Sequence, residues 1–162
     1  MFSSALMVRD AAGNYSEATP DQIIDAARFA IETKAKRGQK FSRPSEVREY
    51  FAIKLGGLER EVFSVIFLDH RHQLIEYAEM FQGTLNEAQV YMREVARKAL
   101  QLNAAAVIVS HNHPSADPAP SSADVVMTKR LREVLELVEV RLLDHIVVGG
   151  NRTVSMAEAG HF

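Results

Sequence analysis

The sequence predicts a mixed α/β fold, with one central sheet and helices on its flanks. Residues 62–68 and 104–110 are short apolar runs rich in β-branched residues, which is typical of strands buried on both faces. Segments with apolar residues at helical spacing lie before, between and after these runs. Strands and helices that alternate in this way form layered α/β domains around a single core.

A first helix is predicted from residue 19 to about residue 38. Thr19 suits the N-cap, Pro20 the first helical position, and Gln22 the reciprocal position of a capping box. Gly38 supplies a stop signal.

Residues 1–44 are predicted to form an N-terminal helical appendage to a main domain of residues 45–162. The first 18 residues are mixed in character, with a turn indicated at Gly13 and Asn14. We therefore expect weak order there, and the appendage to be partly disordered at its start.

The main domain is predicted to begin with a helix that follows Pro44 and ends at the Gly-Gly pair 56–57. The strand 62–68 then turns into a second, more amphipathic strand over 74–81, and Asn86 can cap a helix that runs to about residue 102. The remaining predicted elements follow in order: a strand over 104–110, a helix over 121–137, and closing strands over 141–148 and 152–157.

Composition excludes several classes of function. The 19 basic and 21 acidic residues give a net charge of −2, which argues against a polyanion-binding protein that works by bulk positive charge. The chain contains no Cys, so a disulfide scaffold, a thiolate zinc site and a cysteine nucleophile are excluded. Any metal ion must be held by His and carboxylate side chains.

No apolar run approaches the roughly 18 residues that a membrane span needs. The first ten residues lack the basic start and the long apolar stretch of a signal peptide. We expect a cytoplasmic protein with no membrane partner.

The most informative segment is His111-Asn112-His113 with the Ser121-x-x-Asp124 that follows it. At a strand end, residues i and i+2 point to the same face, so His111 and His113 can both aim into one cavity. The intervening loop contains three prolines and is therefore stiff, and it delivers Asp124 to the first turn of a helix. Two imidazoles and one carboxylate leave a tetrahedral Zn²⁺ with a fourth position for water, as in catalytic sites.

Each part of this pattern also has a structural explanation. Ser121 and Asp124 can form a capping box, which is compatible with a place in the site. Asp117 is an alternative third ligand, although it lies only four residues after His113. We expect His145 to be a buried core histidine, bonded near the site.

Two other histidine patterns carry less weight. His70 and His72 form a second same-face pair, but no Ser-x-x-Asp follows them, and we expect surface histidines in a hairpin turn. The string His-Asn-His does not indicate an HNH nuclease, because that name describes residues spread over a ββα motif.

The pattern H-x-H-x(7)-S-x-x-D resembles the signature of the JAMM (MPN+) metalloproteases, whose eukaryotic members cleave isopeptide bonds to ubiquitin-like proteins. The wider sequence, His-Asn-His-Pro-Ser, then Pro-Ser-x-x-Asp, and residues 142–149 downstream, resembles the bacterial RadC branch. The likeness covers residues 57–162, about two thirds of the chain. It implies the JAMM/MPN fold, with a layer architecture like that of cytidine deaminases.

The resemblance also implies roles for individual residues. His111, His113 and Asp124 would bind Zn²⁺, and Ser121 would donate a hydrogen bond to the oxyanion. The family uses a Glu just before a buried strand as its general base, and Glu61 occupies that place. Glu59 is the alternative, because it shares a face with Glu61 in an extended chain.

This chain departs from the RadC pattern at two places. Ala116 stands where the pattern usually has Gly, and if that position needs a positive φ, Ala costs about 1 kcal/mol. Longer RadC proteins carry an N-terminal helix-hairpin-helix region associated with DNA binding, and residues 1–56 show no Gly-containing hairpin of that kind.

The sequence therefore predicts a zinc-dependent metallohydrolase that cleaves peptide or isopeptide bonds in a polypeptide substrate. One alternative is a DNA-associated accessory factor in repair or in mobile elements, although the charge balance leads us to expect no nucleic-acid partner. The second alternative is a metal-binding scaffold without turnover. The oligomeric state stays open, with a homodimer as one alternative.

Overall fold

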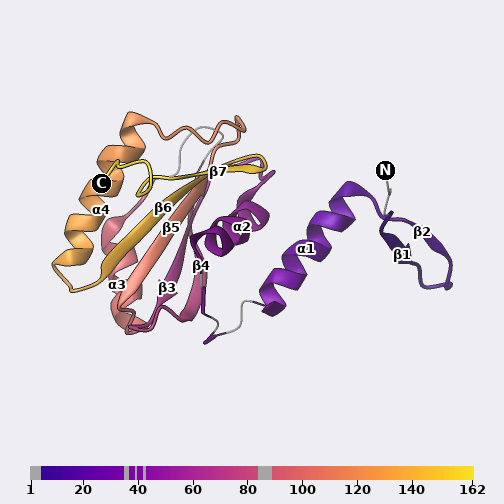
Figure 1. The fold of residues 1–162 in the computed structure, drawn as a ribbon, viewed down its shortest axis with the longest axis horizontal. Helices are drawn as coiled ribbons and strands as arrows, with labels where there is room; N and C mark the ends of the chain where they lie inside the picture. Colours follow the sequence, from indigo (N-terminus) through magenta and orange to yellow (C-terminus); the bar gives the residue numbers. More distant parts are fainter. Residues whose placement is uncertain (1–4, 35–36, 39, 42, 84–88) are drawn as a thin grey trace. The chain divides into compact units, whose positions relative to one another are not determined.

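The structure is a computed structural model that describes the chain except for residues 1–4, 35–36, 39, 42 and 84–88 (Figure 1). The chain divides into two compact units, Met1–Lys34 and Ala35–Phe162. Within the part described, no helix combines the length and the apolar character needed to cross a membrane.

The first unit contains a β-hairpin and a helix. Strand β1 (Met7–Arg9) pairs antiparallel with β2 (Tyr15–Glu17), and helix α1 (Pro20–Lys34) follows. The predicted capping box is confirmed: Thr19 Oγ1 accepts from the Gln22 N–H (3.3 Å), and Gln22 Oε1 accepts from the Thr19 N–H (3.0 Å).

The described residues 5–18 contain a β-hairpin that the sequence analysis did not predict. The Asp10 carboxylate accepts from the Asn14 N–H (2.8 Å), and the Asp10 carbonyl accepts from the Gly13 N–H (3.0 Å), which closes the turn between the strands. Strands of three residues are too short for an alternating pattern to be visible in the sequence. Residues 1–4 lie outside the described residues.

The second unit is built on a five-stranded mixed sheet with the strand order β4-β3-β5-β6-β7. Strands β5 and β6 are parallel, and the other neighbours are antiparallel. The fold class predicted from the sequence is confirmed. The strands are β3 (Val62–Leu68), β4 (Leu74–Gln82), β5 (Ala106–Asn112), β6 (Arg141–Gly149) and β7 (Arg152–Ser155).

Helices cover both faces of this sheet (Figure 1). Helices α3 (Met92–Gln101) and α4 (Ser122–Glu136) pack on one face, and α2 (Pro44–Leu55) packs against β5, β6 and β7 from the other side. Every residue of β3 and β5 is buried, as predicted for strands between two helical layers. The core beneath α3 and α4 includes Phe63, Val65, Phe67, Val95, Ala99, Val107, Val109, Leu131 and Leu135.

Several element boundaries differ from the sequence-based ones, and those of α3 and β5 bear on the site. Helix α3 begins at Met92, with Tyr91 at its N-cap and no side-chain cap. Asn86, which we expected as the cap, lies outside the described residues. Strand β5 continues to Asn112, because its parallel pairing with β6 extends to Val148.

The connector between β5 and α4 lies against the end of β6. A Cβ atom at Gly149 would stand 2.4 Å from Pro118 N and 2.8 Å from the Ala116 carbonyl carbon, so the connector packs on bare backbone there. Ala116 itself has φ +61, which meets the condition under which the sequence analysis expected strain at this residue.

We therefore expect Ala116→Gly to stabilise the protein by about 0.5–1 kcal/mol, because it relieves a left-handed conformation that L side chains adopt at a cost. The free energy of unfolding in urea measures the change. Ala119, in the same exposed connector, has no positive φ, so Ala119→Gly should instead destabilise the protein. Shifts of the same sign in both variants would contradict the assignment of strain to Ala116.

Candidate metal centre

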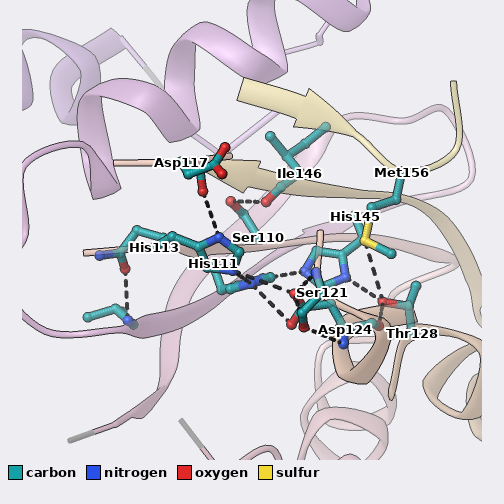
Figure 2. Close-up of polar contacts among 12 residues, drawn as sticks. Ser110, His111, His113, Asp117, Ser121, Asp124, Thr128, His145, Ile146 and Met156 are labelled. Atoms are coloured by element: carbon teal, nitrogen blue, oxygen red, sulfur yellow. Dashed lines mark hydrogen bonds and ion pairs between the residues drawn. The ribbon is translucent and has the colours of Figure 1, made fainter. Parts of the chain in front are cut away.

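Three side chains converge where β5 ends and α4 begins (Figure 2). His111 belongs to β5 and is 2% exposed, His113 follows the strand directly, and Asp124 lies in the first turn of α4. The two Nε2 atoms of the histidines are 2.9 Å apart. Asp124 Oδ1 lies 3.3 Å from His111 Nε2, and Asp124 Oδ2 lies 3.5 Å from His113 Nε2.

The backbone explains why the histidines lie on one side. Side chains alternate along a strand, and the His113 N–H donates to the Val148 carbonyl (2.8 Å), which continues the pairing of β5 with β6 by one residue. His111 and His113 therefore face the same cavity, as their i, i+2 spacing predicts.

Helix α4 brings in the carboxylate through its N-terminal cap. The Ser121 hydroxyl accepts from the Asp124 N–H (3.1 Å), and Asp124 Oδ2 accepts from the Ser121 N–H (2.7 Å), so the predicted capping box is confirmed. The Ser121 hydroxyl also donates to Asp124 Oδ2 (2.6 Å). Three bonds between two residues hold the carboxylate in place in front of the imidazoles.

The dimensions of the cluster suit a small divalent cation. His111, His113 and Asp124 each offer one ligand atom, and these atoms lie within 4.8 Å of one another. A tetrahedral ion with ligand distances of about 2.0–2.1 Å has ligand–ligand edges of about 3.3–3.4 Å, close to the separations found here. Two nitrogen ligands and one carboxylate form a donor set that zinc accepts, with one position left for solvent or substrate.

The electrostatics of the cluster keep Asp124 ionised. Burial raises the pKa of Asp124, but its hydrogen bonds with His111 and His113 lower it more, so the pKa lies well below its usual range. The hydrogen bond with Asp124 raises the pKa of His113, against the opposing effect of burial. The cluster therefore contains a negative charge that attracts a cation.

Glu61 faces this cluster and Glu59 does not. Glu61 lines a cavity of about 160 Å³ together with His111, Asp124 and the apolar side chains of Phe63, Val90 and Met127. Glu59 is exposed and is not among the described residues that line the cavity. The structure thus brings together Glu61, the two histidines and Asp124, with Ser121 beside them.

Asn112 positions the Glu61 segment, a role that the sequence analysis missed. Its Oδ1 accepts from the Val62 N–H (2.8 Å), and its Nδ2 donates to the carbonyls of Arg60 (3.0 Å) and Leu58 (3.3 Å). These bonds fasten the backbone on both sides of Glu61 to β5. The available signal was an Asn directly after a buried apolar strand, between the two histidines of the site.

The alternative ligands have other contacts. Asp117 contacts His113 through its backbone carbonyl oxygen, which lies 2.8 Å from His113 Nδ1. The Asp117 carboxylate accepts a hydrogen bond from the Ala119 N–H (3.1 Å). His145 is fully buried, as expected, and its Nε2 lies 2.7 Å from His111 Nδ1. His72 contacts Arg141 at 3.1 Å.

Comparison with known proteins agrees with this architecture. A family profile described as a RadC-like JAB domain matches residues 41–161. A UPF0758 protein of Vibrio cholerae is 50% identical over 139 residues, which cover 86% of this chain and 87% of that relative. A UPF0758 protein of Xanthomonas oryzae pv. oryzae is 50% identical over 137 residues, which cover 85% of this chain but 61% of that relative. A UPF0758 protein of Halorhodospira halophila is 48% identical over 152 residues, 94% of this chain and 68% of the relative.

The fold and the side-chain cluster define a mixed α/β domain with a candidate metal centre at the end of its central strand. This chain belongs to the RadC-like JAB domain family, which confirms the resemblance found in the sequence.

We expect Asn112→Ala to lower the free energy of unfolding by about 1–3 kcal/mol, because the buried Val62 N–H loses its acceptor. Amide hydrogen exchange at Val62 should accelerate more than exchange elsewhere in β3. Asn151→Ala, at an exposed turn position, serves as the control and should change stability by no more than about 0.5 kcal/mol. Equal effects of the two substitutions would show that Asn112 does not fasten the Glu61 segment.

Proposed function

We propose that this protein is a zinc-dependent metallohydrolase that cleaves peptide or isopeptide bonds with an activated water molecule. The observation that carries the proposal is the convergence of His111, His113 and Asp124 on one point beside Glu61. Hydrolysis by a metal-activated water needs a carboxylate next to the metal ion to act as general base, and Glu61 is in that place.

The hydrogen bonding of His113 supports a cation at this point. Its Nδ1 faces the Asp117 carbonyl, which can only accept, so Nδ1 carries the hydrogen of the neutral ring. In this neutral form Nε2 directs a lone pair toward His111 and the Asp124 carboxylate, and a proton taken up at Nε2 makes the hydrogen bond with Asp124 that raises the pKa of His113. Electron-pair donors that face one another at these distances are stabilised by a shared positive charge.

In the proposed reaction, three residues bind the metal ion and Glu61 transfers the proton. Bound by His111, His113 and Asp124, a zinc ion would supply Lewis acidity and lower the pKa of water at its open position. Glu61 accepts the proton of the attacking water and then donates it to the departing nitrogen.

Ser121 is assigned to the oxyanion, to which its hydroxyl would donate a hydrogen bond. That hydroxyl donates to Asp124 Oδ2 in the structure, so it has to rotate to reach the substrate. The backbone bonds of the capping box hold the residue in place during the rotation.

The proposed substrate is a polypeptide. The apolar side chains of Phe63, Val90 and Met127 line the cavity next to Glu61, and they suit the side chains that flank a peptide bond better than a phosphodiester backbone. The net charge of −2 supports the same choice over nucleic acid.

We expect purified protein to bind one equivalent of Zn²⁺ and His113→Ala to weaken that binding by more than about 100-fold, beyond the usual effect of an outer-sphere change. Competition with a chromophoric chelator measures the dissociation constant. His70→Ala removes an exposed histidine outside the cluster and should leave zinc affinity unchanged. Unaltered zinc binding by the His113 variant would refute the metal centre.

We expect Glu61→Gln to reduce hydrolysis by about 100- to 10,000-fold, because it removes the proton acceptor while keeping the shape of the side chain. The substrates are a proteome-derived peptide mixture and lysine-branched peptides, with new amino termini counted by mass spectrometry. Zinc affinity should stay within about threefold of the unaltered protein, and Glu59→Gln should retain activity. Zinc binding without any cleavage by the unaltered protein would favour a metal-binding scaffold.

A further inference from the structure

A chain of three short hydrogen bonds connects helix α4 to His111 (Figure 2). Thr128 Oγ1 lies 2.6 Å from the backbone carbonyl of Asp124 and 2.6 Å from His145 Nδ1. His145 Nε2 lies 2.7 Å from His111 Nδ1. Thr128 and His145 are both fully buried, so water does not compete for these bonds.

Only one arrangement of hydrogens satisfies all three contacts with a neutral His145. The Asp124 carbonyl can only accept, so the Thr128 hydroxyl donates its single hydrogen to it. The hydroxyl oxygen must then accept from His145 Nδ1–H. A neutral imidazole has one N–H, so His145 Nε2 accepts, and the donor to it is His111 Nδ1–H.

Two competing arrangements are disfavoured. A charged His145 would place a full positive charge in the interior, where the partners of its two nitrogens are the Thr128 hydroxyl and the His111 ring rather than a carboxylate. Met156 Sδ, 3.8 Å from Thr128 Oγ1, is a weak acceptor and offers the hydroxyl less than the carbonyl does.

We infer that Thr128 and His145 are positioning residues that hold a hydrogen on His111 Nδ1 and so leave Nε2 as its metal-binding atom. The inference rests on the proposed metal centre but not on hydrolysis. His113 is held in the equivalent way by the Asp117 carbonyl at its own Nδ1, so both rings turn Nε2 toward Asp124.

Through this chain of hydrogen bonds, helix α4 positions two of the three proposed ligands, Asp124 and His111. Asp124 supplies its carboxylate directly, and its backbone carbonyl is the final acceptor of the bonds that orient His111. Outer hydrogen bonds of this type fix the tautomer of a ligating histidine, and their loss commonly lowers metal affinity by about 10- to 100-fold.

The direct test is ¹⁵N–¹H long-range NMR of the histidine rings in the metal-free, unaltered protein at about pH 8.5, where ordinary imidazoles are neutral. We expect hydrogen on Nδ1 of both His111 and His145. Addition of Zn²⁺ should shift the His111 Nε2 resonance while Nδ1 keeps its hydrogen. Hydrogen on Nε2 of either ring in the metal-free protein would overturn the inference.

Substitutions test the consequence for metal binding. We expect Thr128→Val to weaken Zn²⁺ binding by about 10- to 100-fold, and Thr128→Ser, which keeps the hydroxyl, to restore it to within about threefold. Ser110→Ala is the matched control: it removes a buried hydroxyl that donates to the Ile146 carbonyl (2.7 Å), outside the chain of bonds. It should leave zinc affinity unchanged.

The outcomes separate this inference from the proposed function. If Thr128→Val binds Zn²⁺ no more weakly than Ser110→Ala, or if Thr128→Ser does not restore binding, the positioning role is wrong. If Thr128→Val does not fold, as judged by circular dichroism, the NMR of the unaltered protein decides. If the unaltered protein binds no Zn²⁺, the proposed function fails, and the metal-free NMR still decides which nitrogen carries the hydrogen.

Discussion

The parallel pairing of β5 with β6 is the interaction on which the candidate metal centre depends. Its register places Val109 opposite His145 and His111 opposite Val147, so the two histidines lie side by side on one face. The His113 N–H extends the same pairing to the Val148 carbonyl. Because side chains alternate along a strand, a slip of one residue would turn these rings to the opposite face.

Strand β5 changes character along its length, from an apolar half that packs the core to a polar end from which His111 and Asn112 contact the site. Ser110, His111 and Asn112 are all buried, and each is hydrogen-bonded: to the Ile146 carbonyl, to His145 and to the backbone around Glu61. Buried polar groups are costly unless paired, and once paired they have few alternative positions. The centre is therefore ordered by the protein itself, before any cation is considered.

Local patterns accounted for the parts of the fold that local forces form. The buried strand β3, the hairpin with β4 and the capping box of α4 were all predicted, because each depends on residues close together in the sequence. The β1–β2 hairpin was missed, since its strands are three residues long. The start of α3 at Met92 was misplaced, since its N-cap, Tyr91, makes no side-chain cap that a sequence pattern could signal.

The sequence by itself determined the side-chain types of the candidate metal centre, their shared direction and the stiff connector that carries Asp124 to the histidines, because all of these follow from strand alternation, proline geometry and helix capping. Only the tertiary structure decided that Glu61 rather than Glu59 faces the cluster, that Asn112 fastens the segment around it, and that His145 and Thr128 lie behind His111. Those relations join residues that are distant in the chain. They arise from strand pairing and from the need of buried polar groups for partners, which no local pattern encodes.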